Sequence, residues 1–415
     1  MLSLAAFAAL MALGLPIAFA MIAGAAVQIV LGGNGVLLLS LPQQLFQGME
    51  NTGLLALPIF ILLGELMAES GAGRRLFALA GLGAGGMRGG LAQAVIVANG
   101  LMAAVLGSTV AQITLMARLA VPEMERAGYP RDAAAALTAA GGLLAPVIPP
   151  SMLLIVYGVI AQVPIADLFL AGIGPGLAIL AVLIAVTALT GRRAGFPAPA
   201  PRAASARAAV TGALPALAIP AAMIGAILGG IATPAEAGIV AILAVLFVAL
   251  GALWPALIAT ARSTAAILFL IAAAGLYAWV AAWENLPAMV AQQIQALSGS
   301  PLVFLLLLNL LLLALGMVLD PMPALILVVP VLLPVAMDSY GIDPVHFGLV
   351  ACLNLTLGLL TPPVGVGLHT AAMQTGVPAG RIARLVLPYL GGVLAVLAAL
   401  VLWPGLALGP ARLLQ

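Results

Sequence analysis

Asp320 is the first candidate for chemistry, because it lies in a long stretch of apolar sequence. It is the only acid between Glu284 and Asp338, and two prolines follow it within three positions. A carboxylate in such a stretch is costly unless it faces a cavity or binds a partner. Aspartate before proline is also a good start signal for a helix. We favour a ligand-binding role for Asp320, which is compatible with a second role as a helix cap.

Hydroxyl groups form the second set of candidates. Ser108 and Thr109 interrupt the apolar residues 91–121, and Ser151 and Thr361 flank the prolines of two proline-rich sequences. Where a membrane helix is broken, its free carbonyls and nearby hydroxyls suit a hard monovalent cation such as sodium. The amides of helix N-termini suit an anionic group. These residues are therefore candidates for a site that holds an anionic substrate group beside a cation, although hydroxyls such as those of Ser108 and Thr109 more often bond to the previous helical turn.

The two proline-rich sequences define the elements that position these groups. Leu-Leu-Ala-Pro-Val-Ile-Pro-Pro-Ser at residues 143–151 lies in a stretch without charge between Asp132 and Asp167. Leu-Leu-Thr-Pro-Pro-Val-Gly at residues 359–365 lies in a similar stretch. Proline removes a backbone donor and clashes with the preceding helical turn. Each stretch is therefore predicted to be a membrane helix that opens near its middle, where it lines a polar cavity.

The composition indicates an all-α membrane protein with several spans. Of the 415 residues, 65% are hydrophobic and 6% are charged, whereas soluble domains carry about 25% charged residues. The one cysteine, Cys352, excludes a disulfide framework. The sequence also lacks a His-Glu-x-x-His, a Gly-x-Ser-x-Gly and a P-loop motif. We therefore expect neither an enzyme nor an ATP-driven pump.

Two apolar stretches are too long for a single crossing. Residues 91–121 would form a helix of roughly 45 Å, against a hydrocarbon core of about 30 Å. A hairpin that turns at Gly107 and Ser108 fits better, and residues 301–337 predict a second hairpin at Asp320. Two hairpins place all but one of the arginines considered on one face, as the positive-inside rule asks, with Arg412 opposite. The arginines on that face are Arg74, Arg75, Arg88, Arg126, Arg131, Arg192, Arg193, Arg202, Arg207, Arg262, Arg381 and Arg384.

The second half of the sequence repeats the first with inverted topology. Asn99 matches Asn309 at an offset of 210, and Pro149 matches Pro363 at an offset of 214. Paired broken helices in inverted repeats are typical of alternating-access transporters. The N-terminal repeat is expected over residues 1–200, with scaffold helices at 1–70 and 168–190, a hairpin at 91–122 and a broken helix at 133–161. The C-terminal repeat is expected over residues 201–415, with scaffold helices at 212–282 and 385–408, a hairpin at 301–337 and a broken helix at 345–375.

The sequence resembles the large membrane subunit, or permease, of tripartite ATP-independent periplasmic (TRAP) transporters, in the ion transporter superfamily. Each matching phrase is short, and their order over nearly the whole chain makes the resemblance specific. The phrases lie at residues 57–67, 88–92, 127–129, 146–151, 157–159, 169–172, 233–237, 316–321, 343–348 and 359–365.

The resemblance implies a sodium-driven importer with an elevator mechanism, in which hairpins and broken helices form a transport domain that slides against a scaffold. A periplasmic binding protein would deliver a small organic anion, either a carboxylate or an acidic sugar. A small four-helix membrane subunit would complete the complex in the bacterial inner membrane. By motif position, Ser108, Ser151 and Asp320 would line the substrate pocket, with Thr109 beside them. The backbone that would hold sodium lies around Gly107, Pro146, Gly358, Thr361 and Gly365.

Two other functions remain open. The chain could be a stand-alone sodium/carboxylate symporter of the same superfamily, and uptake without any binding protein would then be observed. It could also be an intramembrane enzyme that uses Asp320 or Ser108, and product formation from a lipid or a peptide would then be observed. We favour the TRAP-type importer over both.

Overall fold

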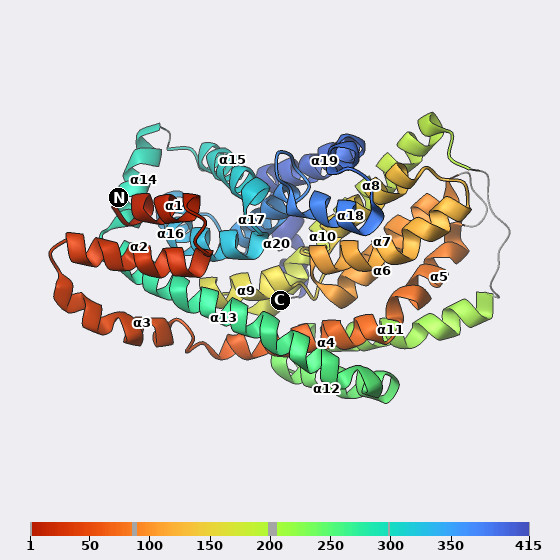
Figure 1. The fold of residues 1–415 in the computed structure, drawn as a ribbon, viewed down its shortest axis with the longest axis horizontal. Helices are drawn as coiled ribbons and strands as arrows, with labels where there is room; N and C mark the ends of the chain where they lie inside the picture. The colour runs from red at the N-terminus through yellow and green to blue at the C-terminus, as the bar shows by residue number, and fades with distance from the viewer. Residues whose placement is uncertain (1, 85–88, 198–205, 298, 415) are drawn as a thin grey trace.

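The computed structural model describes residues 2–84, 89–197, 206–297 and 299–414 of the chain. Over these ranges the secondary structure consists of helices joined by short turns, with no strand (Figure 1). Arg88 and Arg202, two of the predicted topology markers, lie outside the described residues. The fold is therefore all-α, as the composition predicts.

Seven helical segments in the described part of the chain are long and apolar enough to cross a membrane, which confirms a polytopic membrane protein. They are Thr52–Glu69, Ile165–Arg193, Ala206–Leu228, Pro234–Trp283, Pro301–Val318, Pro321–Tyr340 and Ala379–Leu402.

One group of helices forms an outer bundle, in which α2 packs on α13 and α4 packs on both α12 and α13. At its start, Gly14 adopts a left-handed conformation (φ 86°) before Pro16, so that α1 and α2 are separate helices that pack side by side. The members are α1 (Leu2–Ala12), α2 (Ile17–Leu31), η1 (Gly35–Ser40), α3 (Leu41–Gln47), η2 (Thr52–Leu55), α4 (Ala56–Glu69), α11 (Ala206–Leu228), α12 (Pro234–Ala249), η4 (Leu250–Ala252) and α13 (Leu253–Trp283).

A second group forms a central body, which the helices α5 (Ala72–Ala84) and α14 (Leu286–Leu297) connect along the chain to the outer bundle. Its first half contains α6 (Gly90–Leu106), α7 (Thr109–Arg126), α8 (Arg131–Gly141), η3 (Gly142–Leu144), α9 (Met152–Ala161) and α10 (Ile165–Ala194). Its second half contains α15 (Pro301–Val318), α16 (Pro321–Tyr340), α17 (Pro344–Gly358), α18 (Val366–Thr375), α19 (Ala379–Leu402) and α20 (Gly405–Leu414).

The two halves of the central body use corresponding elements in corresponding places. The helices α6 and α7 pack side by side after a turn at Gly107 and Ser108, and α15 and α16 do so after a turn at Leu319 and Asp320. The helices α8 and α9 are separated by the first proline-rich sequence, and α17 and α18 by the second. The helix α18 packs on α7, and its counterpart α9 packs on α16.

The helices α10 and α19 pack on helices of the central body and on each other. The assignment of residues 168–190 and 385–408 to the scaffold stays a prediction; in the structure α10 packs on α19, α20 and α6, and α19 packs on α8, α17 and α18. Their buried apolar faces therefore rest on the broken helices and on each other. Hydropathy cannot distinguish these neighbours, because a lipid-facing helix and a buried helix are equally apolar.

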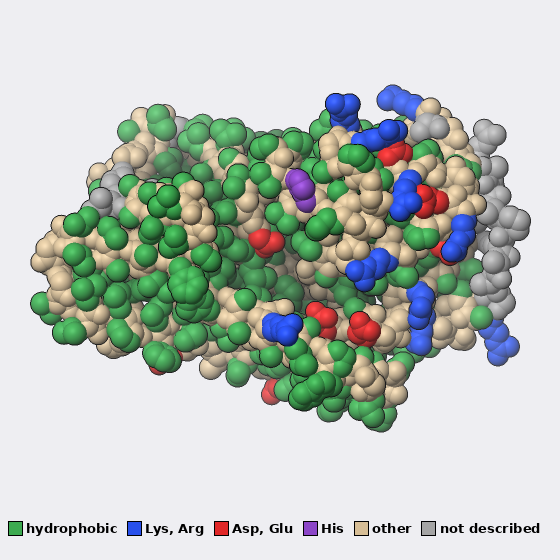
Figure 2. All heavy atoms as spheres, in the orientation of Figure 1, with side chains coloured by type: hydrophobic (Ala, Val, Ile, Leu, Met, Phe, Trp, Pro, Cys, Tyr) green, Lys and Arg blue, Asp and Glu red, His purple; other side chains and the backbone are tan. Residues whose placement is uncertain are grey.

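Polar contacts join the two halves of the central body at its arginine-rich end. Arg118 Nε donates to Gln374 Oε1 at 3.0 Å, and Arg131 Nε donates to the carbonyl of Thr375 at 2.7 Å. In Figure 2 the basic side chains gather toward the part of this face where Figure 1 shows α5, α7 and α8, and the opposite end is mostly hydrophobic. This asymmetry agrees with the arginine pattern of the sequence.

Candidate functional site

A small cavity of about 60 Å³ lies where both hairpin turns meet both broken helices. Its walls come from the turn between α6 and α7, the break before α9, the start of α16 and the end of α17. The residues that line it are Gly107, Ser108, Thr109, Val110, Pro146, Met152, Leu153, Asp320, Pro321, Met322, Thr356 and Leu359.

Three helix N-termini meet at this cavity. The first two residues of α7, α9 and α16 all line it, and the N-cap residues of these helices are Ser108, Ser151 and Asp320. The first turn of a helix carries backbone N–H groups without intrahelical partners and the positive end of the helix dipole. Three such ends around one cavity favour the binding of an anionic group.

The turn of the first hairpin is fixed by its contact with the first break. Gly107 has a φ of 59°, and the backbone N–H of Met152 donates to the carbonyl of Gly107 at 3.3 Å. A Cβ atom on Gly107 would lie 2.6 Å from the carbonyl oxygen of Pro150. Glycine is therefore required here for both conformation and space, and it places Ser108 and Thr109 at the cavity wall.

The second hairpin contacts the second break in the same manner. The backbone N–H of Gly365 donates to the carbonyl of Met317 at 3.1 Å. The backbones of Gly316 and Gly358 meet directly, because a Cβ atom on Gly358 would lie 2.4 Å from the carbonyl carbon of Gly316. This close approach holds the end of α17 against the turn that carries Asp320.

Asp320 caps a helix, as the sequence suggested, and it also lies at the central cavity. Its Oδ1 accepts a hydrogen bond from the backbone N–H of Met322 at 3.1 Å, so it caps α16. The same residue is exposed at the cavity and is the only charged residue among the described residues that line it. The cap leaves Oδ2 without a protein partner among the described residues and therefore open to a ligand.

Ser151 and Thr361 lie near the cavity but do not line it. The hydroxyl of Ser151 is fully buried, where it donates to the carbonyl of Pro146 at 2.6 Å and accepts from the backbone N–H of Leu154 at 3.2 Å. The hydroxyl of Thr361 donates to the carbonyl of Leu357 at 2.8 Å. Both side chains are therefore engaged with the backbone at the two breaks rather than turned toward the cavity.

The backbone positions expected around sodium separate into two places. Gly107 and Pro146 line the central cavity, whereas Gly358, Thr361 and Gly365 lie at the second break. At that break a Cβ atom on Gly365 would lie 3.1 Å from the carbonyl oxygens of both Leu359 and Thr361. Two carbonyl oxygens thus converge on a glycine, which is the kind of oxygen donor set that a hard cation takes.

Sequence reasoning missed Thr356 and Leu359 in the cavity wall. Thr356 is fully buried and its hydroxyl donates to the carbonyl of Cys352 at 2.7 Å. Two features of the sequence could have identified Thr356. It is a hydroxyl residue in an apolar stretch, and it lies one helical turn before the second break.

Buried amides tie each hairpin to the broken helix of its own half. Gln112 Nε2 donates to Asn99 Oδ1 at 3.0 Å and to the carbonyl of Gly141 at 3.1 Å. In the second half Asn354 Nδ2 donates to Asn309 Oδ1 at 2.5 Å and to the Asn309 carbonyl at 3.0 Å. The sequence interpretation of these asparagines as ties between helices is therefore confirmed for Asn99, Asn309 and Asn354.

Replacing Asn354 by leucine is expected to lower the free energy of unfolding by about 1 kcal/mol, the usual range for a hydrogen bond between membrane helices. The change leaves the Oδ1 acceptor of Asn309 unmet inside the protein. Thermal unfolding of the purified variant measures the effect, and the double variant Asn309→Leu/Asn354→Leu completes a mutant cycle. Strictly additive effects of the two single changes would contradict a direct tie between these residues.

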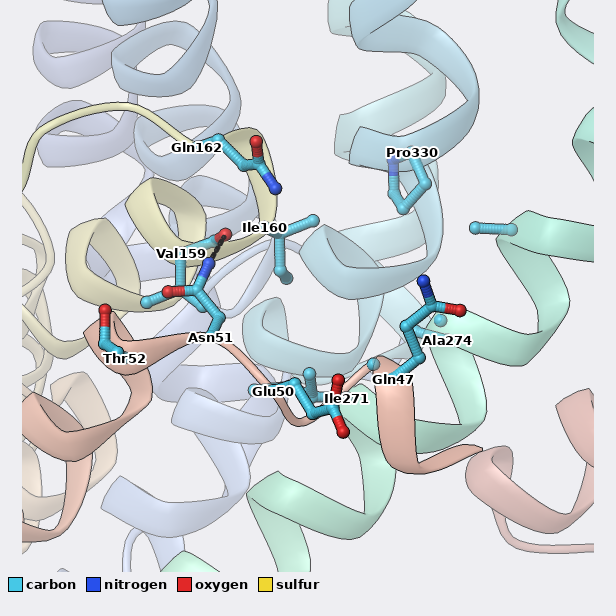
Figure 3. A pocket seen from close by; sticks show the side chains of 13 residues that line it. Gln47, Glu50, Asn51, Thr52, Val159, Ile160, Gln162, Ile271, Ala274 and Pro330 are labelled. Atoms are coloured by element: carbon cyan, nitrogen blue, oxygen red, sulfur yellow. Dashed lines mark hydrogen bonds between the residues drawn. The ribbon is translucent and has the colours of Figure 1, made fainter. Parts of the chain in front are cut away.

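A second cavity, of about 460 Å³, lies between the outer bundle and the central body (Figure 3). Asn51 in the segment before η2 donates from Nδ2 to the carbonyl of Val159 in α9 at 3.1 Å, across the two groups of helices. Gln162 caps α9 with a φ of 55°, and its side chain points over the cavity in Figure 3. Gln47 and Glu50 lie on the opposite wall. Polar side chains from both helix groups therefore line this cavity, and one of them bonds across it.

The fold and the central cavity define a polytopic helical membrane protein of the transporter class, with its site between two hairpin turns and two helix breaks. Residues 4–406 match the family described as the DctM component of tripartite ATP-independent periplasmic transporters. The chain belongs to this family. It is 35% identical over 412 residues to the 2,3-diketo-L-gulonate TRAP transporter large permease YiaN of Escherichia coli, covering 97% of this chain and 96% of the relative.

One further relative and one solved structure are similar to this chain. The C4-dicarboxylate TRAP transporter large permease DctM of Pseudomonas aeruginosa is 36% identical over 383 residues, covering 89% of this chain and 88% of the relative. The crystal structure of the YdaH transporter of Alcanivorax borkumensis superposes with a TM-score of 0.64 at 21% identity, covering 90% of this chain and 89% of that chain. The likeness to YdaH concerns the fold alone.

Proposed function

We propose that this chain imports a small organic anion, a carboxylate or an acidic sugar, together with sodium ions. The observation that carries the proposal is the central cavity, which combines three helix N-termini with the carboxylate of Asp320. The names of the relatives support this substrate class, because 2,3-diketo-L-gulonate and C4-dicarboxylates are both organic anions.

The charges at the cavity favour coupling to a cation. An anion that enters meets the amides at the starts of α7, α9 and α16, but it also meets Asp320, and no arginine, lysine or histidine stands among the described lining residues. Two negative charges repel each other strongly where water is excluded. Sodium would supply the compensating positive charge at the oxygens of Gly107 and Pro146 and at the second break. Binding of the anion then depends on binding of the cation.

We further propose that the central body moves against the outer bundle in an elevator mechanism. The two groups of helices pack mainly within themselves, and α5 and α14 connect them along the chain. The hairpins and broken helices that surround the cavity all lie in the central body, so a rigid movement of this body would carry the site with it. The helices α10 and α19 would move with the site, because they pack on it.

The family is described as tripartite, and we propose both partners for this chain. A periplasmic binding protein would deliver the anion, and a small four-helix membrane subunit would complete the complex in the bacterial inner membrane. We assign no catalytic role to the chain, since its relatives are named as permeases.

Uptake of radiolabelled organic acids into proteoliposomes tests the proposal. An inward sodium gradient is imposed, and the cognate binding protein and small subunit are present or left out. We expect uptake that requires both the gradient and the binding protein. Uptake without the binding protein would indicate a stand-alone symporter instead. No uptake of any organic acid by folded, complete complex would contradict the proposed substrate class.

A further inference from the structure

A third cavity, of about 790 Å³, lies between α5, α6 and α10, away from the central site. Most of its walls are small or apolar, so it forms a groove between helices. The lining residues are Ala80, Gly83, Gly89, Gln93, Val97, Ile184, Thr187, Ala188, Gly191 and Arg192.

The groove extends from the end of α10 into the apolar part of the protein. Ile184 and Arg192 lie two helical turns apart on α10, which corresponds to about 12 Å along the helix axis. This helix is apolar enough to span a membrane and ends in Arg192 and Arg193. One end of the groove therefore lies at the level of the arginines, where lipid headgroups are expected, and the other lies deeper among hydrocarbon.

Three polar side chains line the groove, those of Arg192, Gln93 and Thr187, and the Thr187 hydroxyl donates to the carbonyl of Leu183 at 2.7 Å. Arg192 is the only charged residue among the described residues that line it. Gln93 Nε2 donates to the carbonyl of Ile184 at 3.1 Å, which joins α6 to α10. The Oε1 atom of Gln93 is buried and has no hydrogen-bond partner among the described residues. A buried acceptor without a donor costs free energy, which a bound water would remove.

Backbone and ring contacts surround one end of the groove. The backbone N–H of Gly89 donates to the carbonyl of Pro197 at 3.2 Å, and the rings of Phe196 and Tyr129 lie 5.0 Å apart. A Cβ atom on Gly191 would lie 2.6 Å from the Phe196 ring, so this wall is closed. A Cβ atom on Gly83 would meet nothing within 4 Å, so the opposite wall is open to a larger side chain.

We propose that the groove binds an anionic phospholipid, with an acyl chain between α5 and α10 and the phosphate at Arg192. The apolar walls supply a site for hydrocarbon, which an inorganic ion would not use. The arginine supplies a charge-assisted contact to phosphate, which basic pockets between membrane helices commonly make. Because α5 connects the outer bundle to α6, a lipid held here would support the junction between the two helix groups.

The test measures the thermal unfolding midpoint of the purified chain in neutral detergent while short-chain phosphatidylglycerol, short-chain phosphatidylcholine or inorganic phosphate is added. A ligand that binds the folded state raises the midpoint with its concentration. We expect phosphatidylglycerol to stabilise at the lowest concentration. Arg192→Gln is expected to reduce the preference for phosphatidylglycerol over phosphatidylcholine about fivefold, the usual contribution of one basic residue near anionic lipid.

Two matched controls accompany the variants. Arg193→Gln removes the neighbouring arginine, which does not line the groove, and it should keep the lipid preference. Gly83→Leu fills the open wall and should abolish stabilisation by both lipids, whereas Gly81→Leu, also free of neighbours within 4 Å, should keep it. Equal behaviour of Gly83→Leu and Gly81→Leu, or equal lipid preference in Arg192→Gln and Arg193→Gln, would overturn the proposal. Stabilisation by inorganic phosphate alone would overturn it too.

Discussion

Replacing Asp320 by asparagine is expected to lower the initial rate of sodium-driven uptake roughly 100-fold while the protein stays folded. Asparagine caps helices about as well as aspartate, so the bond from the backbone N–H of Met322 (3.1 Å) to the side-chain oxygen is retained. The negative charge is lost. In the proposed function sodium compensates the negative charge of Asp320, and the loss of this charge-assisted attraction for the cation costs about 3 kcal/mol, which corresponds to about 100-fold in rate or affinity. Uptake into proteoliposomes measures the effect.

Asp343 provides the matched control. It also precedes a proline and caps a helix of the central body, and its Oδ1 accepts from the backbone N–H groups of Val345 at 2.8 Å and His346 at 3.3 Å. It does not line the cavity. Asp343→Asn should therefore transport at the wild-type rate. If Asp320→Asn also transported at that rate, Asp320 would act only as a cap, and its assignment to the binding site would be refuted.

The turns and breaks around the cavity could be predicted because they depend on local chemistry. Gly107 can adopt a positive φ that other residues rarely adopt, and prolines cannot continue a helix. Asp320 was identified for a similar reason, since a lone carboxylate in an apolar stretch is costly without a function. Each of these predictions depends on a few neighbouring residues in the sequence, so it can be made without knowing how the helices pack.

The direction of side chains could not be predicted in the same way. Ser151 lies at the first break as expected, but its hydroxyl bonds to the Pro146 carbonyl and to the backbone N–H of Leu154, and Met152 and Leu153 line the cavity instead. Which of these side chains faces the cavity depends on the orientation of α9, which starts at Met152. A hydroxyl beside a break has its own backbone within reach, which competes with any ligand.

Which helices pack together could not be predicted from short stretches of sequence either. The sequence of α10 is apolar along most of its length, and this pattern fits a scaffold helix in lipid as well as a helix packed on the central body. Two glycines in α10 are a local signal of its packing on the first break. The glycines Gly172 and Gly176 leave room for the first break, because Cβ atoms there would lie 2.5 Å from the carbonyl oxygen of Val147 and 2.8 Å from the Ile148 side chain.

Replacing Gly358 by alanine is expected to destabilise the protein by about 3 kcal/mol, at the upper end of the range for overpacking. The added methyl group would lie 2.4 Å from the carbonyl carbon of Gly316, which belongs to the backbone of α15 and cannot rotate away. The second hairpin must therefore separate from the second broken helix. That movement also strains the backbone bond from Gly365 N–H to the Met317 carbonyl (3.1 Å), beside the turn that carries Asp320. Thermal unfolding and uptake both report the change.

The helix preference of alanine acts in the direction opposite to the predicted destabilisation. Alanine favours a helix by about 1 kcal/mol over glycine, so a change that only replaced glycine in a helix would stabilise the protein. Gly391 in α19 is the control, because a Cβ atom there meets nothing within 4 Å. Gly391→Ala should match or exceed wild-type stability and keep uptake. If Gly358→Ala behaved like Gly391→Ala, α15 and α17 could separate at no cost. The contact of the two glycine backbones would then not be what holds the second hairpin at the site.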